Sequence, residues 1–108
     1  MVNLTEIKAA QALLKGVINV TPCDYSETYS NITGGKIYLK LENLQRTGSF
    51  KVRGAYNKIA ALERKGSCVI TASAGNHAQA VAFAAAKCDR KAIVVMPTVT
   101  PMEKVQAT

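Results

Sequence analysis

Two short stretches of this sequence combine residue types that could bind and activate a small molecule. The first is RTGSFK, residues 46–51, in which Lys51 follows a polar turn and falls in the first turn of a helical pattern. A helix N-terminus carries partial positive charge, which disfavours the ammonium form of a lysine placed there. Loss of solvation between Phe50 and Val52 acts in the same direction. Because a lysine forms a Schiff base through its neutral amine, we expect Lys51 to be a nucleophile.

The second stretch is SAGNHAQ, residues 73–79. Gly75 permits backbone conformations that free neighbouring amides to face a ligand, and a helix start beside them suits a carboxylate or phosphate. Asn76 adds a side chain that both donates and accepts hydrogen bonds. His77, the single histidine, is more typical of a packing or hydrogen-bonding residue than of an acid–base catalyst. The stretch predicts an anion site.

Each stretch also has an ordinary structural interpretation, which the residues alone leave open. Residues 73–79 could form a plain strand-to-helix turn in which Asn76 or Ser73 caps the helix. Lys51 could extend from a half-exposed helix with its stem on apolar surface and its charge in water.

The elements that must position these stretches follow from hydrophobic spacing and from turn residues. Asn3 and Glu6 form a capping-box pattern, with Leu4, Ile7 and Leu14 on one helix face. We expect the stretch VTPCDYSETYSNITGG to be irregular, because Pro22 and the glycine pair break regular structure. The spacing predicts a half-buried strand over 36–42 and buried strands over 67–73 and 91–97. It also predicts helices from Val52 to Gly66, over 74–87 and from Pro101 onward.

Alternating strands and helices of this kind predict an α/β fold with a parallel sheet and right-handed crossovers. In such sheets, ligands bind beyond the carboxyl ends of the strands, near the N-termini of the following helices. Residues 46–51 and 73–79 both lie at such points. We therefore expect the two stretches to face one site.

The composition limits the class of protein. The chain has 108 residues, of which 48% are hydrophobic and 19% are charged, as in one globular domain. No apolar run approaches the ~18 residues of a membrane span, and the N-terminus does not resemble a secretory signal, so we expect a cytoplasmic protein. Three widely spaced cysteines and one histidine predict buried or half-buried thiols rather than disulfides, and no metal site.

The net charge of +7 raises the alternative of nucleic-acid binding. The basic residues are scattered, however, without a run of five or six, and only six residues are aromatic. Attraction of small anions explains the same charge. We expect no nucleic-acid partner.

Three segments together, LKLENLQRTGSFKVRGAYNKI, ITASAGNHAQAVAFAAA and AIVVMPTVTPMEKVQAT, closely resemble pyridoxal-phosphate-dependent threonine dehydratases, also called threonine ammonia-lyases. These enzymes belong to the tryptophan synthase β-like, fold-type II group, and the resemblance covers essentially the whole chain. It implies pyridoxal 5'-phosphate as cofactor, bound to Lys51 as a Schiff base. It further implies that Phe50 packs against the cofactor and that Asn76 pairs with its 3-hydroxyl. The implied loop for the substrate carboxylate consists of Ser73, Ala74, Gly75, Asn76 and His77.

The resemblance implies conversion of L-threonine to 2-oxobutanoate and ammonia, with the freed Lys51 amine removing the α-proton. Threonine synthases and cysteine synthases typically have an acidic residue directly after the lysine, whereas this chain has Val52. Eukaryotic-type serine racemases have a serine where this chain has Ala74, which carries no exchangeable proton, so elimination is favoured over racemisation. L-Serine stays open as a second substrate, as do a serine dehydratase or racemase activity and a catabolic role in place of isoleucine biosynthesis.

Catalytic domains of the group are roughly three times longer than this chain, a size that normally divides into lobes. We therefore expect an N-terminal fragment, with residues 1–48 in the cofactor lobe and residues 49–108 beginning the small α/β lobe. The group often has glycine where this chain has Ala80. An inactive fragment or a binding module is the competing hypothesis. The resemblance implies a homo-oligomer for the full-length protein.

Overall fold

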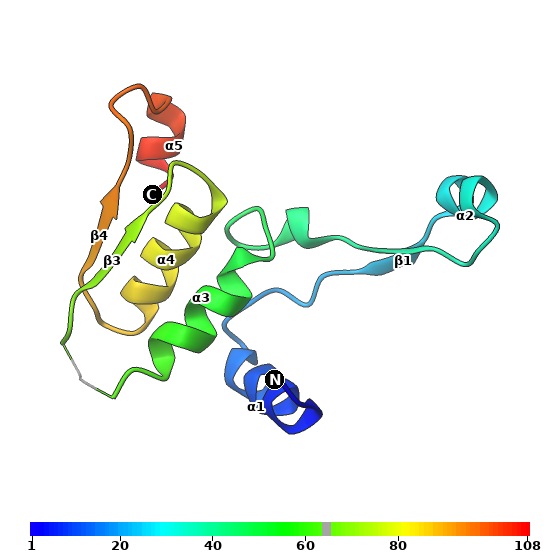
Figure 1. Cartoon of the computed structure of the whole chain (residues 1–108), viewed down its shortest axis with the longest axis horizontal. Helices are drawn as coiled ribbons and strands as arrows, with labels where there is room; N and C mark the ends of the chain where they lie inside the picture. The colour runs from blue at the N-terminus through cyan, green and yellow to red at the C-terminus, as the bar shows by residue number, and fades with distance from the viewer. Residues whose placement is uncertain (64–65) are drawn as a thin grey trace.

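The computed structural model describes residues 1–63 and 66–108 and contains helices and short strands (Figure 1). In chain order these are α1 (Leu4–Leu14), β1 (Cys23–Tyr25), α2 (Glu27–Thr33), β2 (Tyr38–Lys40), the 3-10 turn η1 (Glu42–Leu44), α3 (Lys51–Ala60), β3 (Val69–Ala72), α4 (Asn76–Lys87), β4 (Ala92–Val95) and α5 (Met102–Gln106).

The core lies between α3 and α4, which pack side by side. Helix α3 contributes residues at helical spacing, and α4 contributes small residues that allow the two backbones to approach closely. Figure 1 shows both helices running in the same direction, so that their N-terminal ends lie at the same end of the pair. The buried residues of this cluster are Val52, Ala55, Ile59, Ala80, Val81 and Ala84.

Strands β3 and β4 form a parallel pair joined by α4, as the sequence predicts for a βαβ unit. The register pairs Val69 with Ala92 and Ala72 with Val95. The strands are not fully buried, however. Val69 and Val94 are half-buried, whereas Ile70 and Val95 point to the opposite face and are exposed. The prediction of buried strands is therefore wrong for one face of this sheet.

Residues 20–40 form an arm that extends away from the helix pair (Figure 1). The sequence predicts irregular structure from Val20 to Gly35, and this prediction is wrong, because the segment contains β1 and α2. Ser26 caps the start of α2 through the amide of Tyr29, and Gly34 ends the helix with a φ of 70°. These caps satisfy backbone groups that a short polar helix would otherwise leave open.

The strand predicted over residues 36–42 shortens to β2 and pairs antiparallel with β1. It is thus not a member of the parallel sheet, which is a correction to the expected order of strands. The rings of Tyr25 and Tyr38 meet edge to face across this pair, with centroids 5.4 Å apart. Alternation of apolar and polar residues predicts a strand but not the partner that it pairs with.

The capping box of α1 is confirmed, since Asn3 and Glu6 exchange side-chain to backbone hydrogen bonds. Of the expected apolar face, only Leu14 is buried, while Leu4 and Ile7 are exposed. Helix α3 ends at Ala60 rather than near Gly66. Cys23 and Cys68 are exposed and Cys88 is half-buried, so the expectation of covered thiols is wrong for the first two. None of the helices described is long and apolar enough to cross a membrane.

Candidate active site

Lys51 is the first residue of α3, as the sequence predicts. The preceding turn contains Gly48, which has a φ of 66°, a conformation that favours glycine. The hydroxyl oxygen of Ser49 accepts a hydrogen bond from the Lys51 amide at 3.4 Å. The Lys51 side chain is exposed, with Nζ 5.2 Å from the centroid of the exposed Phe50 ring. The predicted loss of solvation at Lys51 is therefore not found in this chain.

Residues 73–77 connect β3 to α4. The amide of Ser73 donates to the carbonyl of Val95 at 3.0 Å and so continues the parallel ladder by one residue. The hydroxyl oxygen of Ser73 accepts from the amides of Gly75 and Ala78, at 3.3 Å each. Ser73, and not Asn76, thus takes up amide donors at the start of α4. The two hydrogen bonds hold the loop against the helix.

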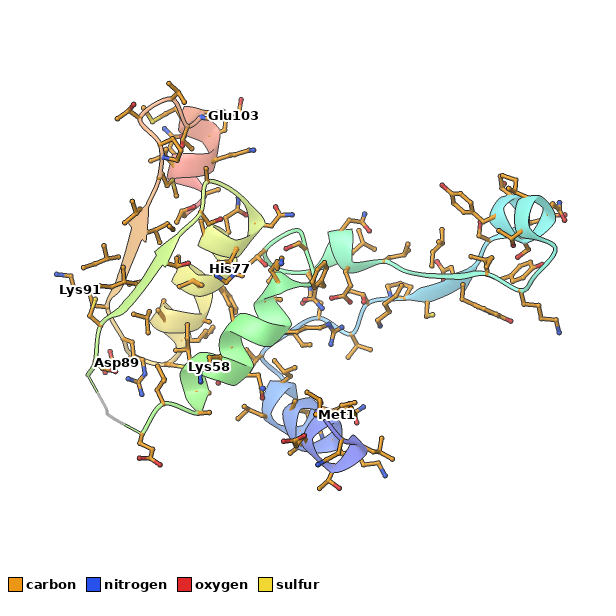
Figure 2. The ribbon with its side chains drawn as sticks, in the orientation of Figure 1. Met1, Lys58, His77, Asp89, Lys91 and Glu103 are labelled. Atoms are coloured by element: carbon orange, nitrogen blue, oxygen red, sulfur yellow. The ribbon has the colours of Figure 1, made fainter. Side chains whose placement is uncertain are left out.

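Asn76 and His77 are the first two residues of α4, and both are exposed. Their amides lie in the first turn, where the helix itself supplies no acceptor. Figure 2 shows His77 at the start of α4 and Lys58 toward the far end of α3. The first turn of α4 therefore offers amide donors and the Asn76 side chain to a ligand.

Gly75 differs from its sequence-based interpretation. Its φ is −149°, outside the left-handed region, and a Cβ built there meets no atom within 4 Å. In this chain the loop geometry does not require glycine at that position. An added side chain would instead stand in the open space in front of the helix start.

The structure brings the two predicted stretches to the same end of the helix pair, because α3 and α4 run in the same direction (Figure 1). Among the described residues, no hydrogen bond or ion pair joins Lys51 to residues 73–77. Two helix N-termini and a free amine at one end make an electropositive surface, which suits a small anion. The two helix starts can accommodate an anionic group, and the exposed Lys51 side chain belongs to the first turn of one of them.

A surface pocket of about 490 Å³ lies next to this end of the molecule. It is lined by the 46–48 turn, by one face of α4 that includes Gln79 and Phe83, and by Ala107 and Thr108. The hydroxyl oxygen of Thr47 is buried without a hydrogen-bond partner among the described residues. None of the predicted site residues lines this pocket.

Sequence reasoning missed a pair of oppositely charged residues, Glu42 and Arg53, of which Arg53 lies two positions after Lys51 in α3. The Arg53 guanidinium donates two hydrogen bonds of 2.8 Å to Glu42, from Nε to Oε2 and from Nη2 to Oε1. These hydrogen bonds lower the pKa of Glu42 to about 2, and the Glu42 carboxylate raises the pKa of Arg53. The two residues are eleven positions apart and belong to different elements, η1 and α3, separated by a turn, so no helix or strand period could indicate this pair.

Similarity to known proteins identifies the family. A family model described as "Pyridoxal-phosphate dependent enzyme" matches residues 14–108. The chain belongs to this family. An L-threonine ammonia-lyase from Thermotoga maritima is 54% identical to it over 110 aligned residues, which cover 100% of this chain and 27% of the relative.

Solved structures of the family share the fold. A serine racemase from Dictyostelium discoideum superimposes with a TM-score of 0.87 at 41% identity, over 98% of this chain and 36% of that one. The processed form of a threonine deaminase from Solanum lycopersicum gives a TM-score of 0.82 at 42% identity, over 95% and 31%. The α/β, fold-type II expectation is thus confirmed, and the chain spans about a quarter to a third of the length of these relatives.

The residues at the candidate site fit the family's cofactor in their chemistry. An aldehyde needs an accessible amine, and the Lys51 amine is exposed at the start of α3. A ring hydroxyl needs a partner that donates and accepts, and the exposed amide of Asn76 does both. Both residues stand at the end of the helix pair where the helix dipoles favour negative charge (Figure 1).

Proposed function

We propose that the protein carrying this chain is a pyridoxal-phosphate-dependent ammonia-lyase that converts L-threonine to 2-oxobutanoate and ammonia. The single observation that carries this proposal is the placement of an exposed amine, Lys51, and the 73–77 loop at adjoining helix starts. The similarity to the Thermotoga maritima L-threonine ammonia-lyase along the whole chain supports the choice of substrate.

In this proposal each residue has a defined role. Lys51 holds the cofactor through its Nζ, and Phe50 packs beside it. Asn76 hydrogen-bonds the ring hydroxyl. When bound, pyridoxal phosphate supplies an electron sink for negative charge at the substrate α-carbon. The Lys51 amine, once freed, removes the proton from that α-carbon, and the hydroxyl group leaves from the β-carbon.

The 73–77 loop binds the substrate carboxylate in this proposal. Amides in the first turn of α4 lack helical acceptors and can donate to a carboxylate. The Ser73 hydroxyl already accepts from Gly75 and Ala78, so its own hydrogen is free to point toward the substrate. His77, exposed at the same helix start, adds a polar side chain to the rim. The loop thereby orients the α-carbon toward Lys51.

A serine racemase is the second candidate, because solved serine racemases share this fold at about the same level of identity as the threonine deaminases. Ala74 disfavours it, since a methyl group cannot deliver a proton to the opposite face of the α-carbon. We propose that L-serine is processed as a weaker substrate. The loss of one methyl group in an apolar pocket reduces kcat/KM by roughly 10- to 200-fold.

The decisive experiment uses the complete protein with pyridoxal phosphate, borohydride reduction and peptide mapping. We expect the reduced cofactor adduct on Lys51. The variant Lys51→Ala should lose 2-oxobutanoate formation by a factor on the order of 10³ or more. Lys58→Ala is the matched control, because Lys58 is an exposed lysine in the last turn of the same helix. An adduct on another lysine, or turnover by Lys51→Ala, would contradict the proposal.

Three wider expectations belong to the same proposal. The division at residues 48 and 49 into a cofactor lobe and the start of a small lobe is one. A homo-oligomeric assembly of the full-length protein and a cytoplasmic location are the others. Sedimentation of the complete protein and fractionation of the source cells test the last two.

A further inference from the structure

The start of α3 has one local side-chain hydrogen bond, from the Lys51 amide to the Ser49 hydroxyl oxygen at 3.4 Å, and otherwise lacks the features that usually fix a helix N-terminus. Its N-cap residue, Phe50, makes no side-chain capping hydrogen bond, and no acidic residue lies in the first turn. The first turn instead carries two cations, Lys51 and Arg53, against the positive end of the helix dipole. Besides the hydrogen bond at Ser49, contacts with other elements therefore fix the position of this turn.

Glu42 provides that contact through the two hydrogen bonds from Arg53. Only 15% of the Glu42 side chain and 35% of the Arg53 side chain are exposed, so water screens this pair less than a fully exposed one. Because the Arg53 guanidinium is planar and donates through both Nε and Nη2, the pair fixes the orientation of the Arg53 side chain as well as its distance from Glu42. Glu42 thus supplies to α3 the carboxylate that the helix lacks.

Glu42 is itself held in place by neighbouring segments. The hydroxyl of Thr21, which is buried, donates to Glu42 Oε1 at 2.5 Å, and Lys40 Nζ donates to the Thr21 carbonyl. Next to this contact, the Gln45 side chain exchanges two hydrogen bonds with the backbone of Asn19. The carboxylate that receives Arg53 therefore sits on a structure built from two chain segments.

The spacing along α3 connects this anchor to Lys51. Successive helical residues are rotated by about 100°, so Lys51 and Arg53 point to nearly opposite sides of the helix. Between them, Val52 is completely buried in the core. With Val52 held in the core and Arg53 held at Glu42, the rotation of the first turn is determined. Lys51 is left as the free residue, and its direction follows from the other two.

We propose that Glu42 and Arg53 form a positioning pair for Lys51, which holds the first turn of α3 so that the Lys51 amine faces the candidate site. This inference rests on the role of Lys51 in the proposed function. It assigns no contact with substrate to either residue.

The test uses the complete protein after removal of its cofactor, with the variants Glu42→Gln, Arg53→Lys and the double variant. The probe is pyridoxal phosphate followed by borohydride. The Lys51 nitrogen forms a bond to the aldehyde carbon with loss of water, and borohydride then supplies hydride to that carbon. The rate of Lys51 labelling is measured against cofactor concentration at a temperature far below unfolding. Lys58→Met, a loss of charge at the other end of α3, is the control.

We expect each single variant to lower the limiting rate of labelling by about tenfold, because small displacements of a reacting group are costly. The cofactor concentration at half the limiting rate should stay unchanged. The double variant should lose no more than either single variant, because the two residues act as a unit. Amide hydrogen exchange should increase at the first turn of α3 in these variants and not in Lys58→Met.

Two outcomes would overturn the inference: labelling at the wild-type rate in both single variants, or slower labelling that appears only where the variants begin to unfold. If Glu42→Gln does not fold, Arg53→Lys, which keeps the charge and loses the planar fork, decides alone. If the wild-type protein is not labelled at Lys51, the proposed function fails. If it is labelled and the variants match it, only the positioning role fails.

Discussion

At the scale of single residues, the first turn of α3 assigns a different task to each of three consecutive side chains. Lys51 is exposed, Val52 is buried and Arg53 is paired with Glu42. The sequence predicts the positions of Lys51 and Val52 because both follow from helical spacing after a turn. It does not predict the pairing of Arg53, because the partner lies eleven residues away across a turn.

The Glu42–Arg53 pair makes stability depend on pH in a defined range. The pKa of Glu42 falls from 4.5 to about 2 on folding. The contribution of the Glu42 carboxylate to the free energy of unfolding is therefore complete above pH 4.5 and is lost as the pH falls toward 2. We expect Glu42→Gln to lower the free energy of unfolding by about 1–3 kcal/mol at pH 7. The difference from wild type should shrink steadily as pH is lowered from 5 to 2.

Thermal unfolding followed by circular dichroism at a series of pH values measures this difference. Glu103→Gln is the matched control, because Glu103 is exposed in α5. A loss of stability in Glu42→Gln, relative to wild type, that is equally large at pH 7 and pH 2 would contradict the prediction.

At the scale of elements, the chain is predictable where apolar spacing is regular and local. The helix over Asn76–Lys87, the parallel strands on either side of it and the capped α1 all follow the sequence. The arm was missed because β1 has three exposed residues and α2 is polar and short. Strand β1 has no buried residue and α2 buries only the polar Ser30, so neither leaves a hydrophobic period to detect. Tertiary pairing and end caps determine both elements.

The close contact of α3 and α4 depends on alanines in α4. Ala84 is completely buried, whereas Ala86 on the same helix is exposed. We expect Ala84→Leu to destabilise the fold by about 1–3 kcal/mol or more, because the extra carbons must push the helices apart. Ala86→Leu should change the free energy of unfolding by less than about 0.5 kcal/mol. Urea unfolding measures both, and equal effects would mean that the helices are not tightly packed at Ala84.

The packing also bears on Ala80, where the resemblance leads one to expect glycine. Ala80 is completely buried in the core cluster inside a helix, and the fold accommodates its methyl group. Alanine is favoured over glycine inside a helix by roughly 1 kcal/mol. The methyl group of Ala80 is therefore compatible with the packing of the described elements.

At the scale of the whole molecule, apolar side chains stand on the surface of the sheet. The face of β3 and β4 turned away from α4 exposes Ile70, Ile93 and Val95. A contiguous apolar face of this kind is typical of a surface that contacts other protein. The sequence predicts that these strands are buried. The chain spans only about a quarter to a third of the length of its relatives.

This face gives a prediction for the 108-residue chain studied by itself. We expect concentration-dependent self-association in sedimentation velocity, and we expect Ile70→Lys to reduce it. Ile32→Lys is the matched control, because Ile32 in α2 is 73% exposed and Ile70 is 70% exposed. If both substitutions reduce association equally, general surface hydrophobicity rather than the sheet face is responsible.

The order of elements around Lys51 has a consequence for how the site is assembled. Turn η1, helix α3, strand β3 and helix α4 occupy the stretch between Glu42 and Lys87, so the surroundings of the amine come from neighbouring parts of the chain. Contacts between residues close in sequence form quickly, because little loop entropy is lost in closing them. Lys51 and the 73–77 loop should therefore acquire their mutual orientation early in folding, before the slower and more distant pairings of the protein.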